Sequence, residues 1–246
     1  MSGSRLLVIA GPTACGKSAL GVEVAEILGG EIISADAFAV YRGMDVGTDT
    51  PGTALRRRVP HHLLDVAFPT EQFSAGDFAH AAEAAVADIT ARDRTPIVVG
   101  GSHFYIRALL LGLFPAPPRD PTLRRHLQRR WEQDPVGVLA HLRAVDPAAA
   151  HRIGPADRQR ILRALEVYLA SGSPLSDHWH GHPQQLRHPT LMVAPERLRG
   201  ELYARIDARV DRMFATGLEK EVEELLAAGV PPDAHPLKAI GYRQVV

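Results

Sequence analysis

Residues 11–18 have the types and spacing of a phosphate-binding loop. They are Gly11, Pro12, Thr13, Ala14, Cys15, Gly16, Lys17 and Ser18, which fit G-x-x-x-x-G-K-[ST] between an apolar run and a helical pattern. In this pattern backbone amides turn toward a polyphosphate beside the positive end of a helix. Lys17 adds a positive charge, and the Ser18 hydroxyl suits a Mg²⁺ ion that bridges phosphate oxygens. The pattern predicts polyphosphate binding without naming the reaction, because kinases, ATPases and GTPases share it.

Two further polar side chains follow short apolar runs. Asp36 comes directly after residues 31–35, and Ser102 follows residues 96–99 and two glycines. The carboxyl ends of parallel strands meet at one edge of a sheet, so we expect both side chains near the phosphate loop. A carboxylate there could hold magnesium through water or act as a general base toward an acceptor. The spacing alone leaves these two roles open.

The runs that must position these residues indicate an α/β fold. Four apolar segments, 6–10, 31–35, 96–99 and 190–194, have strand character. Apolar residues at steps of three and four predict helices over 18–28 and 75–92. Strands that alternate with helices favour a mostly parallel sheet. We predict a core like that of the P-loop-containing nucleoside triphosphate hydrolases.

A proline-rich stretch between residues 115 and 121 interrupts this alternation. The chain then shows a helical, arginine-rich region to about Ser171, followed by a loop over 172–189 that leads back to the core and to a helix from near Glu196. We predict a discontinuous core of residues 1–114 and 190–246. A mainly helical insertion over residues 115–189 separates its two parts.

Composition limits the class of protein. The chain has 246 residues, of which 46% are hydrophobic, and no apolar run approaches the roughly 20 residues of a membrane span. We expect a cytoplasmic protein without membrane contact. The single cysteine excludes an intrachain disulfide. Basic and acidic residues number 28 each, so net charge gives no support for a nucleic-acid partner.

Charge is nevertheless uneven between residues 119 and 163. Ten arginines stand there against five acidic residues, and the arginines are Arg119, Arg124, Arg125, Arg129, Arg130, Arg143, Arg152, Arg158, Arg160 and Arg163. Charge alone leaves open whether this is a solvated helical face or a nucleic-acid surface.

Histidines give weaker signals. His178, His180 and His182 stand at two-residue steps, but no other residues have ligand spacing, so we expect no zinc site there. The adjacent His61 and His62 would face opposite sides of a strand, and we expect them to make structural hydrogen bonds.

Seven motifs occur in order along the chain. They are GPTACGKS (11–18), IISADAFAVYRGMDVGT (32–48), PHHLLD (60–65), VGGSHFYIRALLLGL (99–113), DRQRILRALEVY (157–168), LYARIDARVDRM (202–213) and KAIGYRQ (238–244). Together they closely resemble the tRNA dimethylallyltransferase, or tRNA isopentenyltransferase, family. The resemblance runs from residue 6 to the end of the chain.

The resemblance implies transfer of a dimethylallyl group from dimethylallyl pyrophosphate to the N6 amine of the adenosine 3′ to the anticodon in tRNA. Residues 11–18 would hold the pyrophosphate, with Ser18 on Mg²⁺. Asp36 would be the general base for the amine, whose lone pair is delocalised into the ring. Arg209, with Arg205 one turn earlier, would stabilise the leaving pyrophosphate. Ser102 stands where the family usually has threonine and keeps the hydroxyl.

The resemblance also implies three tRNA-binding segments, and with it the basic segment is expected to contact tRNA. The residues are Asp36, Ala37, Phe38, Ala39 and Ser102; Arg124, Gln159, Arg160, Ile161, Leu162 and Arg163; and Lys238, Ala239, Ile240, Gly241, Tyr242 and Arg243. Ala37 and Ala39 replace the family's Ser and Gln, which leaves backbone contacts in that loop.

Three alternatives stay open. A P-loop nucleoside or nucleotide kinase would consume ATP. An isopentenyltransferase for free adenine nucleotides would not need an extended basic surface, and a non-catalytic RNA-binding module would not need Asp36. Family members usually continue past KAIGYRQ, so we expect a truncated chain whose donor binding survives better than its tRNA affinity. We expect a monomer.

Overall fold

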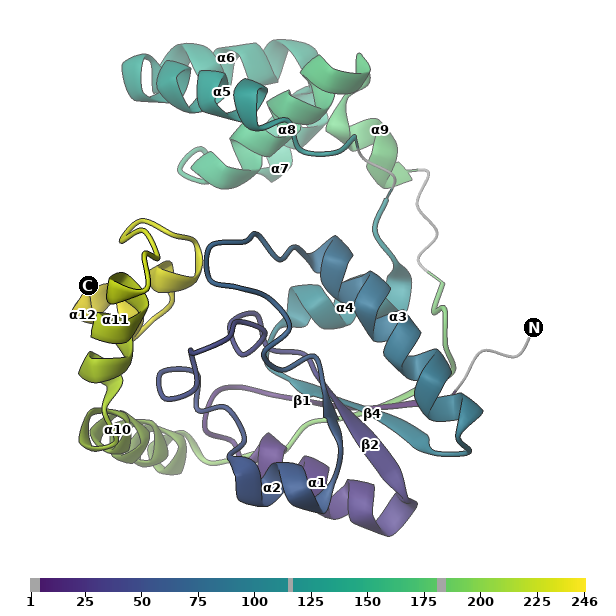
Figure 1. Cartoon of the computed structure of the whole chain (residues 1–246). Helices are drawn as coiled ribbons and strands as arrows, with labels where there is room; N and C mark the ends of the chain where they lie inside the picture. Colours follow the sequence, from purple (N-terminus) through teal and green to yellow (C-terminus); the bar gives the residue numbers. More distant parts are fainter. Residues whose placement is uncertain (1–4, 115–116, 181–184) are drawn as a thin grey trace. The chain divides into compact units, whose positions relative to one another are not determined.

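The computed structural model describes residues 5–114, 117–180 and 185–246 (Figure 1). The chain forms two compact units. One contains Met1–Gly112 and Gln185–Val246, and we call it the core unit. The other, Leu113–Gln184, is called the insert unit.

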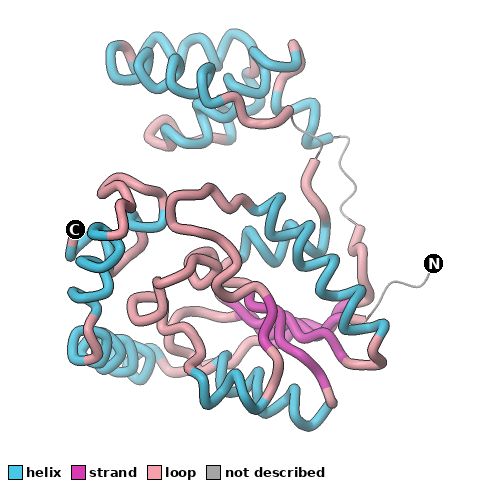
Figure 2. The backbone as a smooth tube through the Cα atoms, in the orientation of Figure 1, coloured by secondary structure: helices cyan, strands magenta, loops and turns pink. Residues whose placement is uncertain are grey.

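Five parallel strands form the centre of the core unit, in the order β3-β2-β4-β1-β5. They are coloured magenta in Figure 2. Their bounds are β1 (Leu6–Ala10), β2 (Gly30–Ser34), β3 (His61–His62), β4 (Thr95–Gly100) and β5 (Thr190–Val193). Four of them match the predicted runs to within about a residue at each end, which confirms the parallel α/β fold. The two-residue β3 extends the sheet by pairing with β2.

Helices cover both faces of this sheet. Within the described ranges, the helices of the core unit are α1 (Lys17–Leu28), α2 (Thr53–Arg58), α3 (Ala75–Ala91), α4 (His103–Leu111), α10 (Arg199–Ala215), α11 (Leu218–Ala227), η1 (Pro236–Lys238) and α12 (Tyr242–Val245). No helix in those ranges has both the length and the apolar character needed to cross a membrane.

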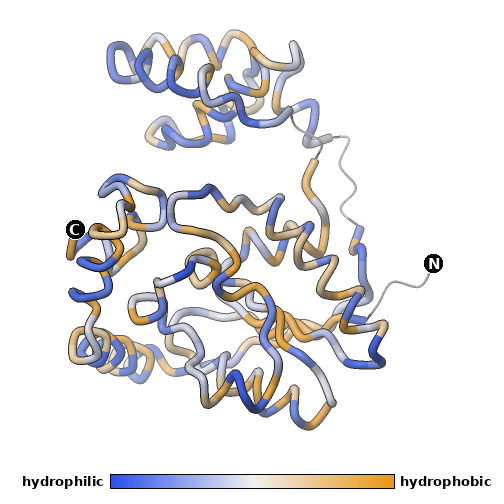
Figure 3. Tube along the Cα trace, viewed as in Figure 1, coloured by the Kyte–Doolittle hydropathy of each residue, from blue (hydrophilic) through white to orange (hydrophobic). Residues whose placement is uncertain are grey.

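Strand residues alternate between two apolar clusters, as side chains with a period of two must. Ile33 and Val98 pack in the cluster that includes residues of α3 and α4. Their neighbours Ile32 and Ile97 pack in the cluster that includes Val22 of α1. Both faces of the central strands are therefore buried, which explains their continuous apolar runs, orange in Figure 3.

The insert unit is helical, and aspartates begin its helices. It consists of α5 (Pro121–Gln133), α6 (Pro135–Val145), α7 (Pro147–Arg152), α8 (Arg158–Ser171) and α9 (Leu175–His180). Asp120, Asp134, Asp146 and Asp157 each accept backbone amides at the start of α5 to α8. Proline follows three of these aspartates at the first helical position, where its missing amide costs nothing.

The predicted loop over 172–189 is wrong where α9 lies. Leu175 is buried in the insert's apolar cluster, and the amide of Ser176 donates to Asp146 Oδ2 at 3.0 Å. This burial and this hydrogen bond stabilise a short helix that the Gly- and Pro-rich composition concealed. His182 lies outside the described residues.

The backbone of Gly100, at the end of β4, lies close to the backbone of Ala35, directly after β2. A Cβ atom on Gly100 would lie 2.1 Å from the carbonyl oxygen and 2.4 Å from the carbonyl carbon of Ala35. Because these are backbone atoms, they can move only if the sheet moves. Only glycine therefore fits at position 100. Its neighbour on the adjacent segment is Ala35, the residue before Asp36.

We expect Gly100→Ala to lower the free energy of unfolding by about 2 kcal/mol, as overpacking against backbone does. Urea denaturation followed by circular dichroism would measure it. Gly200→Ala is the control, because Gly200 lies in α10 with open space around it and alanine favours a helix. Equal stability of the two variants would contradict the steric argument.

Candidate functional site

Three strand ends bring the predicted chemistry to one edge of the core unit. Parallel pairing aligns Ala10 with Gly100 and Ser34 with Val99, so the chain leaves β1, β4 and β2 at nearly the same level. Residues 11–18, Ser102 and Asp36 follow these ends directly. The amide of Ser102 donates to the carbonyl of Ala35 at 3.1 Å, which places it beside Asp36. Its hydroxyl makes no capping bond to α4.

The phosphate loop is closed by contacts within itself. Gly16 has φ of 96° and Ala14 has φ of 63°, both in the left-handed region. Lys17 Nζ donates to the Pro12 carbonyl at 3.0 Å. The Cys15 side chain is buried and lies against Gly11. These contacts within residues 11–18 give the loop its compact geometry.

The Asp36 carboxylate uses one oxygen to shape its own loop. Oδ1 accepts hydrogen bonds from the amides of Phe38 at 2.9 Å and Ala39 at 3.1 Å. Oδ2 accepts none from the residues that the structure describes. The side chain is half-buried, so its position is fixed while one oxygen remains available to a ligand.

Arg209 reaches the same edge from α10. Its Nη2 donates to the carbonyl of Thr48 at 3.0 Å, and its Nη1 lies 3.4 Å from Asp49 Oδ2. Asp49 has φ of 55°, a conformation that Asp adopts more readily than most residues. The Arg209 guanidinium is therefore held between the Thr48 carbonyl and the Asp49 carboxylate at the sheet edge.

Two more arginines bind the phosphate loop from outside. Arg205 Nε donates to the Ala14 carbonyl at 2.8 Å, and Arg197 Nε donates to the Cys15 carbonyl at 3.2 Å. Arg197 also pairs with Glu201 at 2.7 Å. The motif that contains Arg205 predicted a role for it, whereas Arg197 was not predicted. Its signal was available, because β5 is also a parallel strand and the residues after it emerge at the same edge.

These elements enclose one pocket of the core unit. Burial lowers the pKa of His61, which lies in the pocket wall, so its imidazole is neutral near pH 7. The polar lining residues are Lys17, Ser18, Ser34, Asp36, Thr48, Asp49, Thr50, His61 and Arg209, and the others are Ile32, Ala39, Pro51, Val99 and Gly100. The pocket combines two cations with a carboxylate whose second oxygen is free to bind a ligand.

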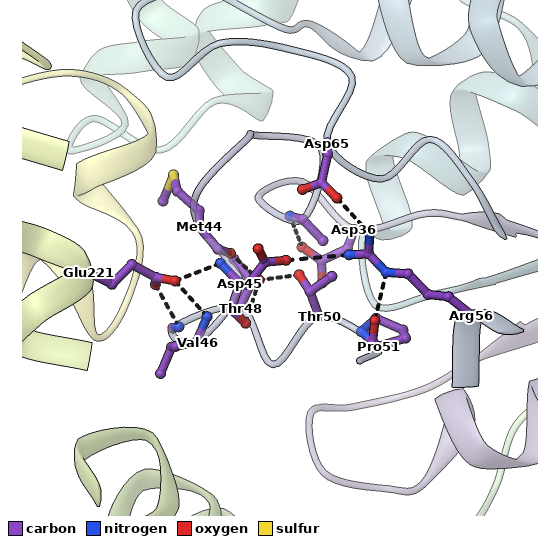
Figure 4. Close-up of polar contacts among 12 residues, drawn as sticks. Asp36, Met44, Asp45, Val46, Thr48, Thr50, Pro51, Arg56, Asp65 and Glu221 are labelled. Atoms are coloured by element: carbon purple, nitrogen blue, oxygen red, sulfur yellow. Dashed lines mark hydrogen bonds and ion pairs between the residues drawn. The ribbon is translucent and has the colours of Figure 1, made fainter. Parts of the chain in front are cut away.

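A polar network supports the wall of the pocket (Figure 4). Arg56 pairs with Asp65 at 2.7 Å and with Asp45 at 3.3 Å, and its Nε donates to Pro51 at 2.7 Å. Burial raises the pKa of Asp45, with a further contribution from the charge of Asp65. No local sequence pattern indicates Arg56, whose partners are Asp45, Pro51 and Asp65.

The histidines of β3 make the structural hydrogen bonds that were expected. His61 Nδ1 lies 2.8 Å from the Val59 carbonyl, and His62 Nε2 lies 2.7 Å from the buried carboxylate of Glu31. These contacts anchor the edge of the sheet.

The predicted tRNA-binding residues of the core unit differ in exposure. Lys238, Ile240 and Arg243 are exposed, whereas the side chains of Ala239 and Tyr242 are buried. Buried side chains pack the interior in this structure, so any contact through them would need the chain to rearrange. In the Asp36 loop, Phe38 stacks on His235 with ring centroids 6.1 Å apart, and Ala39 is buried.

The same division holds in the insert unit. Gln159 and Arg160 are exposed, but Ile161 and Leu162 are fully buried in its apolar cluster. Arg124 and Arg163 are half-buried. Four of the five acidic residues between 119 and 163 are the helix caps described above, where they face positive helix ends. The acids are thereby engaged locally, and exposed arginines dominate the remaining charge.

Comparison with known proteins identifies the family. The sequence model of the IPP transferase family matches residues 39–246. The chain belongs to the IPP transferase family. Among its members, the tRNA dimethylallyltransferase 1 of Trichlorobacter lovleyi is 50% identical over 245 residues, which cover 98% of this chain and 80% of that protein.

Solved structures of IPP transferase relatives share the fold. The tRNA delta(2)-isopentenylpyrophosphate transferase of Staphylococcus epidermidis superposes with a TM-score of 0.67 and 35% identity, covering 98% of this chain and 79% of that one. A eukaryotic dimethylallyltransferase acting on tRNA gives a TM-score of 0.80 at 28% identity, covering 92% of this chain and 56% of that one.

In the insert unit, Glu166 holds two of the arginines predicted to bind tRNA. The Glu166 carboxylate is buried, and its Oε2 lies 3.5 Å from Arg124 Nη1 and 3.3 Å from Arg163 Nη1. These are ion pairs rather than hydrogen bonds, because the atoms lack hydrogen-bond geometry. Arg163 Nη2 also donates to the Pro117 carbonyl at 2.9 Å. Both arginines thus have a structural task within the insert unit.

We expect Glu166→Gln to lower the free energy of unfolding of the insert unit by about 2 kcal/mol, because it leaves two half-buried guanidinium groups without a counter-charge. Both tryptophans of the chain, Trp131 and Trp179, lie in this unit, so their fluorescence during urea denaturation reports on it selectively. Glu132→Gln is the control, since Glu132 is exposed in its pair with Arg158. A difference below about 0.5 kcal/mol between the variants would contradict this role.

Proposed function

We propose that this chain transfers a dimethylallyl group from dimethylallyl pyrophosphate to the N6 amine of the adenosine 3′ to the anticodon in tRNAs, with release of pyrophosphate. The observation that carries the proposal is the pocket in which Lys17, Asp36 and Arg209 meet. It offers cations for a leaving pyrophosphate and a carboxylate for an amine proton. Relatives that match nearly all of the chain are named tRNA dimethylallyltransferase, which supports the group transferred and the tRNA acceptor.

In the proposed reaction, the bond between the allylic carbon and the pyrophosphate oxygen breaks while the amine nitrogen bonds to that carbon. Negative charge grows on the leaving oxygen, so positive groups fixed there lower the barrier. Lys17 and Arg209, which both line the pocket, supply them together with the amides of residues 11–18.

The amine proton goes to Asp36. The N6 lone pair of adenine is delocalised into the ring, and removal of a proton as the new bond forms restores its nucleophilicity. Oδ2 is the oxygen for this task, because Oδ1 is occupied by two backbone amides. Ser102 lies beside Asp36, and its hydroxyl, which does not cap α4, would bond the acceptor base or the bridging oxygen.

Magnesium suits the donor end of this pocket. Within the described ranges, no group of three or more His, Cys, Asp or Glu side chains is placed to form a protein cage for a metal. Mg²⁺ is commonly held by few protein ligands together with substrate phosphates and water, and the exposed Ser18 hydroxyl fits that mode. When bound, the ion would neutralise charge on the pyrophosphate.

The tRNA would contact exposed basic and polar side chains of both units. Arg160 and Gln159 of the insert unit and Lys238 and Arg243 of the core unit are exposed, and arginine contributes both phosphate contacts and stacking on bases. The acceptor adenine must leave the stack to react, so binding of neighbouring nucleotides is part of the proposal. The proposal also includes action as a monomer in the cytoplasm.

The activity can be tested with labelled dimethylallyl pyrophosphate, Mg²⁺ and unmodified tRNA, with AMP as acceptor in a parallel reaction. We expect label on tRNA alone. Label on AMP would instead identify a free-nucleotide isopentenyltransferase. If neither acceptor is labelled, phosphoryl transfer from ATP to a nucleoside or nucleotide would identify a kinase.

Asp36→Asn tests the general base without disturbing the loop. Asparagine keeps the Oδ1 acceptor for the amides of Phe38 and Ala39 but cannot take the proton. We expect single-turnover transfer to fall by roughly 100-fold or more, with donor affinity little changed. Asp93→Asn is the matched control, because Asp93 is exposed and its positive φ suits asparagine equally. Near-normal transfer by Asp36→Asn with both substrates bound would disprove the general-base role.

A further inference from the structure

The carboxylate of Glu221 accepts three hydrogen bonds that join α11 to the loop over residues 45–49 (Figure 4), and a fourth from Tyr242 of α12. Its Oε2 accepts from the amides of Asp45 and Val46, each at 2.8 Å. Its Oε1 accepts from the amide of Gly47 at 3.0 Å and from the Tyr242 hydroxyl at 2.5 Å. A carboxylate that receives three successive amides fixes both the position and the orientation of that backbone.

This stretch of backbone leads directly to the groups that hold Arg209. Thr48 offers its carbonyl oxygen to Arg209 Nη2, and Asp49 offers its carboxylate to Nη1. In the loop over 45–49, the first amides therefore donate to the Glu221 carboxylate of α11. The Thr48 carbonyl accepts from the Arg209 guanidinium of α10. Because Thr48 and Asp49 belong to this loop, displacement of the loop would also displace its contacts to Arg209.

Packing reinforces the hydrogen bonds. A Cβ atom on Gly47 would lie 2.4 Å from Cε2 and 2.5 Å from Cζ of Tyr242, so the Tyr242 ring lies directly against the loop backbone. Burial raises the pKa of Tyr242, and its bond to Glu221 adds to the shift, so the hydroxyl remains a donor at neutral pH. The fully buried Tyr242 side chain is an internal support rather than a surface for tRNA.

We infer that Glu221, with Tyr242, is a positioning residue of the active site. It holds the loop over 45–49 so that Thr48 and Asp49 keep Arg209 at the pyrophosphate. Neither Glu221 nor Tyr242 is among the described residues that line the pocket, so both act through others. The inference rests on the proposed function, because it assigns Arg209 to the donor.

Glu221→Gln and Tyr242→Phe test this role. Glutamine keeps the shape of the side chain but loses the charge and one of the two acceptor oxygens. Binding of dimethylallyl pyrophosphate with Mg²⁺ would be measured by calorimetry on the full chain. We expect about tenfold weaker binding for Glu221→Gln and about threefold for Tyr242→Phe. Glu223→Gln, exposed on the same helix, should stay within about twofold.

A double-mutant cycle with Arg209→Ala separates positioning from a general loss of stability. We expect Glu221→Gln to change donor affinity by less than about twofold in the Arg209→Ala background, because the loop no longer has that guanidinium to position. The inference would be overturned if the double variant lost affinity by the product of the losses in Glu221→Gln and Arg209→Ala. Unchanged donor affinity in the single variant Glu221→Gln would also overturn it. Absence of donor binding by the unmodified chain would be visible before any variant is tested, and would overturn the proposed function together with this inference.

Discussion

The close approach of Gly100 to Ala35 sets the geometry on which the rest of the site depends. Because β4 lies between β1 and β2 in parallel register, the chain leaves all three strands at one level. The strand register alone therefore places the phosphate loop, Asp36 and Ser102 side by side. A side chain at Gly100 would separate β4 from β2, and the distance from Asp36 to the phosphate loop would grow with that separation.

The second half of the site comes from a distant part of the sequence. Arg205 contacts a carbonyl 191 residues before it, and Arg209 contacts one 161 residues before it. Closing such long loops is slow compared with forming local structure, so the pocket is completed only after the chain has returned from the insert unit to the core. The arginines of α10 and the carboxylate of α11 fasten that returning segment to loops that the first half of the chain has built.

The sequence predicted the strands well because their signal is local. The runs that became β1, β2, β4 and β5 are apolar on both faces, and the phosphate-loop pattern lies between a strand and a helix that the structure also contains. It could not predict that Ile161, Leu162 and Tyr242 would be buried, because a motif shared with a family does not separate residues that pack from residues that bind. Glu221 was missed for a different reason. It binds the amides of a loop 174 to 176 residues away in sequence, and a hydrogen bond to an amide leaves no pattern in the residues that it joins. Arg56 was missed because its ion pairs with Asp45 and Asp65 depend on how the loops around it fold.

The arginines behind the phosphate loop change the chemistry of the peptide groups that they touch. A peptide's carbonyl and amide point in opposite directions, so a guanidinium that holds the Cys15 carbonyl turns the amide of Gly16 toward the other side of the loop. A cation at the oxygen also draws electrons through the conjugated C–N bond and makes that N–H a stronger donor. Arg197 can therefore strengthen the hydrogen bond that the Gly16 amide donates to an anion. Arg205 polarises the peptide between Ala14 and Cys15 in the same way.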